Sequence, residues 1–117
     1  MQIQTTAIGR RAEDVTAEYL KRRGFVVMHH NWRRRDYEID LIAQKDRVMY
    51  FVEVKYRATN QAGSGIEYIT PRKLKQMAYA ARRWTSECGW CGEYALSVVE
   101  VGGEAFEVTE FIESIDT

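Results

Sequence analysis

Apolar residues recur at helical spacing in the first part of the chain. Between residues 5 and 24 they fall on one face of a predicted helix. The residues of this apolar face are Ile8, Ala12, Val15, Tyr19 and Leu20. Either Thr5 or Thr6 can cap this helix, and Gly24 stands where a C-terminal glycine belongs.

A second helix is expected to begin at Pro71, with Thr70 as its N-cap. Its apolar stripe consists of Leu74, Met77, Ala78, Ala81 and Trp84. The polar, glycine-rich stretch "RATNQAGSG" before this helix, residues 57–65, predicts a mobile loop.

Short runs rich in β-branched and aromatic residues predict five strands. They lie in "FVVMHH" (25–30), in a hairpin "YEIDLIAQKDRVMYFVEVKYR" (37–57), in "YALSVVEV" (94–101) and in "AFEVTEFIE" (105–113). A basic connection "NWRRRDY" precedes the hairpin, and the glycines at 102 and 103 predict a tight turn. The order αβββαββ predicts one α/β domain, residues 1–117, with a mixed β-sheet flanked by helices.

Charged residues interrupt the hairpin, although an unpaired charge in the middle of a sheet is costly. Side chains alternate along a strand, so Asp40 lies on one face of the first hairpin strand and Ile39 and Leu41 lie on the other. Glu53 and Lys55 share one face of the second hairpin strand.

The turn of the hairpin sets how these charges meet. A two-residue turn at Asp46–Arg47 places Asp40 directly opposite Glu53, and one at Lys45–Asp46 places them diagonally. Either turn brings both carboxylates and Lys55 together. Paired carboxylates with a backbone carbonyl and waters suit Mg²⁺, and a nearby lysine can orient water beside a phosphate. The alternative is an ion network that neutralises itself inside the sheet.

Composition is that of an ordinary globular domain, with 45% hydrophobic and 29% charged residues. Without a membrane-spanning run or a secretory signal, the chain is expected to be cytoplasmic. Residues 1–83 hold all 17 Lys and Arg with 9 acids, whereas residues 84–117 hold 8 acids and no base. This polarity fits a phosphate-binding side and, equally well, ordinary solvated helix faces.

Cys88 and Cys91 in "CGWC" are compatible with half of a zinc site, a redox pair or a turn. The remaining candidate zinc ligands, His29 and His30, are adjacent to each other and far away in the sequence. Glycine between the cysteines favours the turn.

Asp40, followed after a hairpin by Glu53-Val54-Lys55, resembles the core of the PD-(D/E)XK nucleases. Together, "GRRAEDVTAEYL", "EIDLIA", "FVEVKYR" and "TPRKLKQM" resemble the bacterial YraN family over about residues 9–86. The resemblance implies a restriction-endonuclease-like fold related to archaeal Holliday junction resolvases. That family usually has glycine before "EID", where this chain has Tyr37, so the entry to this strand is expected to differ.

The resemblance also assigns roles. Asp40 and Glu53 would hold Mg²⁺ or Mn²⁺ with the Val54 carbonyl as a third ligand, and Lys55 would position or activate water. Glu13, in "RRAED", matches a further acid that a helix contributes in this superfamily, where it assists through water or a second ion. The alternative for Glu13 is an exposed acid facing a neighbouring arginine.

Basic and aromatic side chains around this site are expected to touch a nucleic-acid backbone, although each one alone is more often solvated. They are Arg10, Arg11, Trp32, Arg33, Arg34, Arg35, Arg57, Arg72 and Lys73.

The sequence therefore predicts a metal-dependent DNA endonuclease that selects branched or single-stranded regions by their structure, as in repair or recombination. A homodimer would suit a junction substrate. One alternative is a non-catalytic nucleic-acid-binding module of the same fold that acts with a partner protein. Another is an interaction protein that docks through the acidic segment 84–117.

Overall fold

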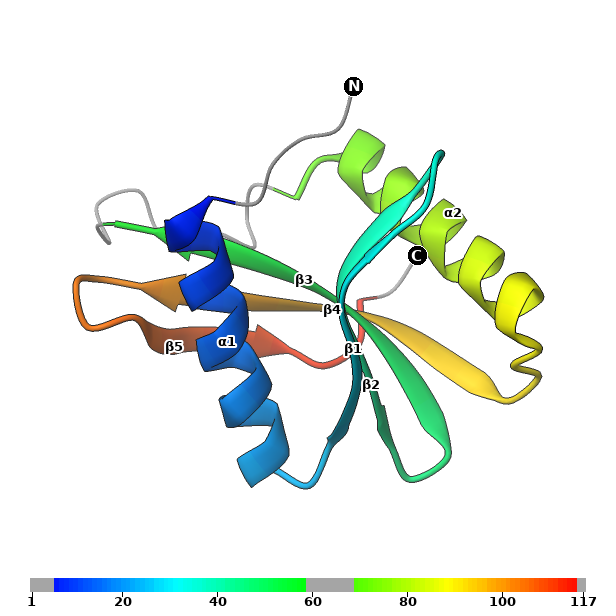
Figure 1. The fold of residues 1–117 in the computed structure, drawn as a ribbon, viewed down its shortest axis with the longest axis horizontal. Coiled ribbons are helices and arrows are strands. Elements are labelled where there is room, and N and C mark those ends of the chain that lie inside the picture. Colours follow the sequence, from blue (N-terminus) through cyan, green and yellow to red (C-terminus); the bar gives the residue numbers. More distant parts are fainter. Residues whose placement is uncertain (1–5, 59–68, 116–117) are drawn as a thin grey trace.

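The structure is a computed structural model that describes residues 6–58 and 69–115. Its elements are α1 (Ala7–Arg22), β1 (Val26–Arg33), β2 (Glu38–Lys45), β3 (Val48–Arg57), α2 (Pro71–Cys88), β4 (Glu93–Gly102) and β5 (Glu107–Ile112). Their order is the predicted αβββαββ (Figure 1). The predicted loop at 57–65 lies, from residue 59 onward, outside the described residues.

The five strands form one sheet in the order β1-β2-β3-β4-β5. The β3–β4 pair is parallel, and the other neighbouring pairs are antiparallel. A parallel pair needs a long crossover between its strands, and α2 lies in that crossover. The result is a mixed α/β fold of the restriction-endonuclease-like type, as predicted.

The two helices cover opposite faces of the sheet (Figure 1). Helix α1 packs Ala12 and Leu20 in a core cluster with Leu41 and Val52 of the sheet. Helix α2 belongs to a second cluster on the other face, which contains Met77, Ala81, Trp84, Ile42, Phe51 and Val98. The central strands are therefore buried on both sides, and any charged side chain on them is partly shielded from water.

Both helices begin and end largely as predicted. Thr6 Oγ1 accepts a hydrogen bond from the Gly9 N–H at 2.9 Å, and Thr70 Oγ1 accepts one from the Lys73 N–H at 3.0 Å. Gly24 follows α1 with a positive φ of 91°. The predicted face of α1 was wrong at one end, because Ile8 is 52% exposed.

Two strand boundaries differ from the prediction. Strand β1 continues through the predicted connection as far as Arg33. Strand β5 begins only at Glu107, because the turn after β4 extends beyond the two glycines to Phe106. The ring of Phe106 stacks on the ring of Tyr56 at 4.6 Å, which gives this longer turn an apolar anchor.

The hairpin turns at Asp46–Arg47, the first of the two predicted alternatives. Both residues have positive φ, 51° and 67°, as a two-residue type I′ turn requires. The register runs from Lys45 opposite Val48 to Leu41 opposite Val52. Asp40 is the next residue along β2, on the side of Glu53.

Strands β2 and β3 stop pairing beyond Leu41 and Val52, and the β1–β2 end rises away from β3 toward α2 (Figure 1). As a result Ile39 joins the α2-side cluster together with Ile42. The predicted alternation, which placed Ile39 on the opposite face, is therefore wrong here, because β2 turns as it leaves the sheet. This separation opens the space in which the charged residues gather.

Cys88 ends α2, and Gly89 caps the helix in the left-handed conformation with φ 73°. Cys88, the last residue of the helix, and Cys91, in the turn that follows, are both exposed free thiols, which agrees with the favoured interpretation. Neither α1 nor α2 is long and apolar enough to cross a membrane.

Candidate active site

The carboxylate of Asp40 lies at the point where β2 and β3 separate. Its Oδ2 atom accepts a hydrogen bond from the Val54 N–H at 2.9 Å. Beyond Leu41 and Val52, β2 no longer offers a backbone carbonyl to β3. The Asp40 carboxylate takes the place of that carbonyl as the acceptor for the Val54 N–H. The N–H and C=O of a strand residue point to the same edge, so the Val54 carbonyl is also directed toward Asp40.

Glu13 reaches the same place from α1. It is only 8% exposed, and its Oε1 atom accepts a hydrogen bond from Asn31 Nδ2 at 2.8 Å. The carboxyl groups of Glu13 and Asp40 are close enough that each affects the pKa of the other. Burial raises the pKa of Glu13, whereas the hydrogen bond from Asn31 and the interaction with Asp40 oppose that rise. The sequence-based alternative, an exposed acid facing an arginine, does not describe this side chain.

Asn31 is a site residue that the sequence analysis missed. It has a positive φ of 49°, which is uncommon outside glycine. The neighbouring pairs, His30 with Leu41 and Trp32 with Ile39, place it across from Asp40 in the β1–β2 register. Asparagine tolerates this backbone conformation better than most residues, which is the one signal the sequence carried. The strained backbone directs an amide donor at the acidic site.

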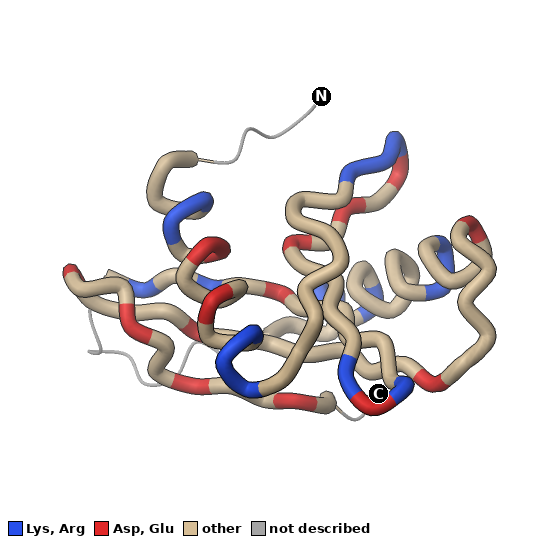
Figure 2. Tube along the Cα trace, turned by 60° about the horizontal axis from the view of Figure 1, so that its bottom comes forward, with Lys and Arg blue, Asp and Glu red and all other residues tan. Residues whose placement is uncertain are grey.

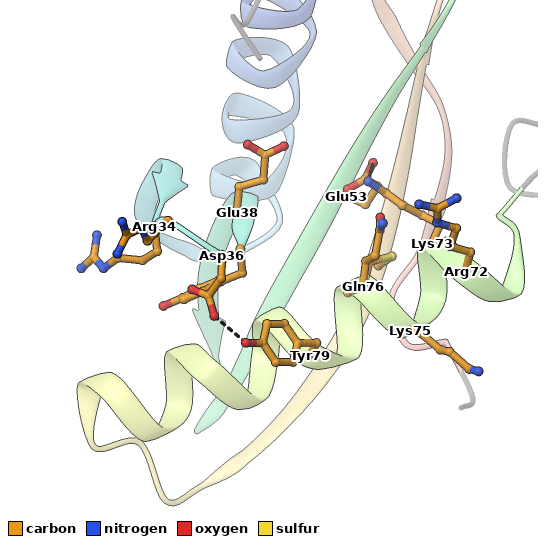
Figure 3. A pocket seen from close by; sticks show the side chains of 12 residues that line it. Arg34, Asp36, Glu38, Glu53, Arg72, Lys73, Lys75, Gln76 and Tyr79 are labelled. Carbon is orange, nitrogen blue, oxygen red and sulfur yellow. Dashed lines mark hydrogen bonds and ion pairs between the residues drawn. The ribbon is translucent and has the colours of Figure 1, made fainter. Parts of the chain in front are cut away.

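Glu53 approaches from β3 and faces α2. Its Oε2 atom lies 3.2 Å from Nζ of Lys73, and the two side chains are 17% and 36% exposed. Lys73 is the third residue of α2, so the helix start places one positive charge directly beside the acidic group (Figure 3). Lys73 was predicted as a phosphate contact, and here its partner is Glu53.

The electrostatics of Asp40 reflect this crowding. Its pKa is raised well above the ordinary value, first by burial, then by the negative charge of Glu53 and to a smaller extent by that of Glu13. The hydrogen bond from the Val54 N–H and the positive charge of Lys73 act in the opposite direction. A carboxyl held in this way gains most from an additional cation or from a proton.

Lys55 is half-buried on β3, two residues beyond Glu53. Among the residues that the structure describes, no hydrogen bond or ion pair holds its ammonium group. Its neighbour in the β3–β4 register is Glu100, which is 5% exposed and engaged elsewhere. Thr109 Oγ1 donates to Glu100 Oε1 at 2.8 Å, and Arg57 Nη1 lies 3.8 Å from Glu100 Oε2.

The carboxylate oxygens of this site are suitable ligands for a divalent cation, but they do not form a complete ligand set. Within residues 6–58 and 69–115, no three Asp, Glu, His or Cys side chains are arranged so that they could hold a metal ion. Mg²⁺ nevertheless binds proteins through one or two carboxylates and keeps several waters. Asp40 and Glu53, which repel each other, together with the Val54 carbonyl, fit that type of site.

A groove with a volume of about 640 Å³ leads to Glu53 (Figure 3). Its walls are the N-terminal half of α2 and the connection between β1 and β2. Basic residues from both walls line it: Arg34, Arg35, Arg72, Lys73 and Lys75. Asp36 and Glu38 also line the groove, which therefore carries an excess of basic residues and reaches the acidic site at Glu53.

Polar contacts hold the β1–β2 connection on α2. Arg34 Nη2 lies 2.6 Å from Glu87 Oε2, and Tyr37 Oη donates to Glu87 Oε1 at 2.7 Å. Asp36 pairs with Arg83 and accepts a hydrogen bond from the Tyr79 hydroxyl. Tyr37, which precedes β2, is buried and is not among the described residues with positive φ. A tyrosine therefore suits the strand entry of this chain.

The remaining predicted nucleic-acid contacts have different surroundings. Trp32 is half-buried beside Trp84, and the guanidinium of Arg34 lies over its ring at 4.0 Å. Arg33 forms an ion pair with Glu38, and Arg11 lies over Phe106 at 4.3 Å. Exposed side chains belong to Arg10, Arg11, Arg34, Arg35 and Arg72. Contact of any of these residues with nucleic acid stays a prediction.

Acidic residues have a different distribution from the basic ones (Figure 2). On the edge strand β5 and just after it, Glu107, Glu110 and Glu113 follow one another without an intervening base. Charges on an edge strand discourage pairing with another sheet. For these three glutamates of the acidic segment, the position at an edge strand offers a structural explanation.

Comparison with known proteins gives one consistent family. The model of the uncharacterised protein family UPF0102 matches residues 12–108. This chain belongs to the UPF0102 family. UPF0102 is the same grouping as the YraN family that the sequence motifs indicated.

Individual UPF0102 proteins align over most of the chain. One from Leifsonia xyli is 45% identical over 87 residues, 74% of this chain and 69% of its own length. One from Prosthecochloris aestuarii is 41% identical, over 74% of this chain and 65% of its own length. One from Sulfurihydrogenibium is 38% identical over 99 residues, 84% of this chain and 86% of its own length. Membership in this uncharacterised family assigns no activity, so the function is inferred from the geometry of the site.

Proposed function

We propose that this protein is a metal-dependent endonuclease that hydrolyses phosphodiester bonds in DNA and selects its substrate by structure. One observation carries the proposal. Carboxyl groups from three elements lie close together: Glu13 of α1, Asp40 of β2 and Glu53 of β3. The ammonium group of Lys73 lies beside Glu53, at the end of a groove rich in basic residues. A purely structural ion network has no need of a groove that leads to it.

In this account Asp40, Glu53 and the Val54 carbonyl hold Mg²⁺ or Mn²⁺. When bound, such a cation polarises a phosphate oxygen and makes water a better nucleophile. The attacking water forms the new bond to phosphorus, the bond to one sugar oxygen breaks, and that oxygen takes up a proton.

Lys55 orients the attacking water and stabilises negative charge on the phosphate, because no described partner competes for its ammonium group. Glu13 accepts a proton from water on the α1 side, with Asn31 fixing its orientation. The basic groove positions the strand through its phosphates, without reading bases.

Cleavage of end-labelled DNA tests the proposal. The protein is incubated with a four-way junction, a flap and a linear duplex, in Mn²⁺ or EDTA, beside the Lys55→Ala variant. We expect metal-dependent cleavage of the branched substrates that falls by about a hundredfold or more in the variant. Cleavage that persists in EDTA, or that Lys55→Ala leaves unchanged, would contradict the proposal.

A second candidate is a nucleic-acid-binding module of the same fold that does not cut DNA. The incomplete ligand set among the described residues favours it. It predicts a salt-sensitive shift of branched DNA in a gel, unchanged by Mn²⁺ or EDTA, with intact substrate. The same incubations therefore separate the two candidates.

A further inference from the structure

Lys73 pairs with Glu53 of the acidic site, and its position connects the site with the groove. Its Nζ atom lies 3.2 Å from Glu53 Oε2, and its positive charge lowers the pKa of Asp40. The same side chain lines the groove beside Arg72 and Lys75 (Figure 3). Lys73 therefore has two alternative sets of anionic partners: the carboxylates of the site and phosphates in the groove.

The two sets differ in how firmly they can hold Lys73. Glu53 is mostly buried, with 17% of its side chain exposed, whereas Lys73 is 36% exposed at the first turn of a helix. A partly exposed pair of this kind is weak and exchanges readily. A divalent cation on Glu53 would repel the ammonium group and turn it toward the groove, because like charges at this distance oppose each other.

We propose that Lys73 neutralises Glu53 in the metal-free protein and that divalent-cation binding releases it to bind a phosphate of the nucleic acid. This inference rests on the proposed function, because it assumes that the cation binds at Glu53. Lys73 then serves as a phosphate-binding residue whose availability depends on the metal. Metal binding and nucleic-acid binding reinforce each other as a consequence.

The metal-binding half of this proposal is tested by calorimetric titration of the DNA-free protein with Mn²⁺. Lys73→Met removes the competing charge, so it should bind Mn²⁺ about three- to tenfold more tightly than the wild type. Lys75→Met is the matched control, because Lys75 lies on the same helix and lines the same groove. Its Mn²⁺ affinity should equal that of the wild type, and Glu53→Gln should lose binding.

The phosphate-binding half is tested with a single-stranded oligonucleotide in Ca²⁺ or EDTA at several salt concentrations. In the wild type, the slope of log affinity against log salt should steepen by roughly one when Ca²⁺ is added, because one more phosphate contact forms. Lys73→Met should show no such steepening, whereas Lys75→Met should keep it.

The outcomes separate this inference from the proposed function. Equal Mn²⁺ affinity in the wild type and Lys73→Met, with binding lost in Glu53→Gln, would overturn the role of Lys73 and leave the metal site standing. No Mn²⁺ binding in the wild type would overturn both. Thermal melting of each variant verifies the fold, and Lys73→Gln repeats the test with a polar side chain.

Discussion

Asp40 on β2 accepts a hydrogen bond from the backbone N–H of Val54 on β3, at the point where the two strands stop pairing. The bond spans the opening between the strands and holds the Asp40 carboxyl group close to the carboxyl groups of Glu13 and Glu53. Burial and the charge of Glu53 raise the pKa of Asp40 well above its usual value. This geometry is unfavourable for the folded protein and useful for a site that binds cations.

We expect Asp40→Asn to stabilise the protein. Because the pKa of Asp40 is raised on folding, the folded state binds its proton more tightly than the unfolded state does. The stabilisation from the protonated carboxyl is therefore lost as pH rises through the folded pKa. Asparagine stays neutral, so the variant should gain on the order of 1 kcal/mol at mildly alkaline pH in EDTA.

Urea denaturation at several pH values measures this difference. The gain should shrink toward acid pH, where the wild-type carboxyl is already protonated. Glu107→Gln, on the exposed edge strand β5, provides a control with little expected effect. A destabilised Asp40→Asn protein at alkaline pH would show that the charge of Asp40 is favourable in the fold.

Mn²⁺ binding should strengthen as pH rises and then level off. The raised pKa of Asp40, together with that of Glu13, means that protons compete with the cation at the lower end of this range. Each bound cation should therefore release a proton there, which calorimetry in buffers of different ionisation enthalpy detects. Affinity independent of pH, with no proton release, would place the cation away from Asp40.

Much of the site could be predicted from the sequence, because strand alternation and the turn at Asp46–Arg47 together fix the register. That register places Asp40 beside Glu53. Alternation alone failed at Ile39, since β2 turns as it leaves β3 and no residue pattern announces that separation. The closeness of Glu13 and Asp40 depends on this change in the direction of β2. It became predictable only through the family resemblance.

Asn31 shows a second limit of the sequence. Its side chain supports Glu13, but a single asparagine in a strand does not reveal a positive φ. Likewise, the sequence shows that Lys73 and Arg57 are basic, but not that carboxylates already pair with them. Which partner a long charged side chain selects is decided by packing between elements far apart in the chain.

Replacement of Asn31 should separate its backbone role from its side-chain role. Because φ is 49° at this position, Asn31→Ala should be about 1 kcal/mol less stable than Asn31→Gly. Both variants lose the hydrogen bond to Glu13, so both should cut about ten- to hundredfold more slowly. Denaturation curves and single-turnover rates test this pair, and alanine and glycine variants of equal stability would argue against backbone strain.

Arg57 should matter for stability more than for nucleic-acid binding. Its side chain is 18% exposed and lies 3.8 Å from Glu100, whose side chain is buried. Arg57→Met leaves that carboxylate buried without this partner, so the protein should lose about 2–4 kcal/mol. Arg35→Met, at an exposed groove residue, should cost little, and Arg57→Met with Glu100→Gln should recover part of the loss. A fully stable Arg57→Met protein with weakened DNA binding would contradict this prediction and would show that Arg57 contacts nucleic acid instead.

In the proposed function, the carboxylates at the separation of β2 and β3 form a metal-dependent phosphodiesterase site. Single-turnover cleavage of a labelled four-way junction in Mn²⁺, by the wild type and by Asp40→Ala, tests it most directly. Circular dichroism of the variant verifies that the fold is kept. We expect cleavage by the wild type and none detectable by the variant. A folded Asp40→Ala protein that cuts the junction at the wild-type rate would contradict the proposed function.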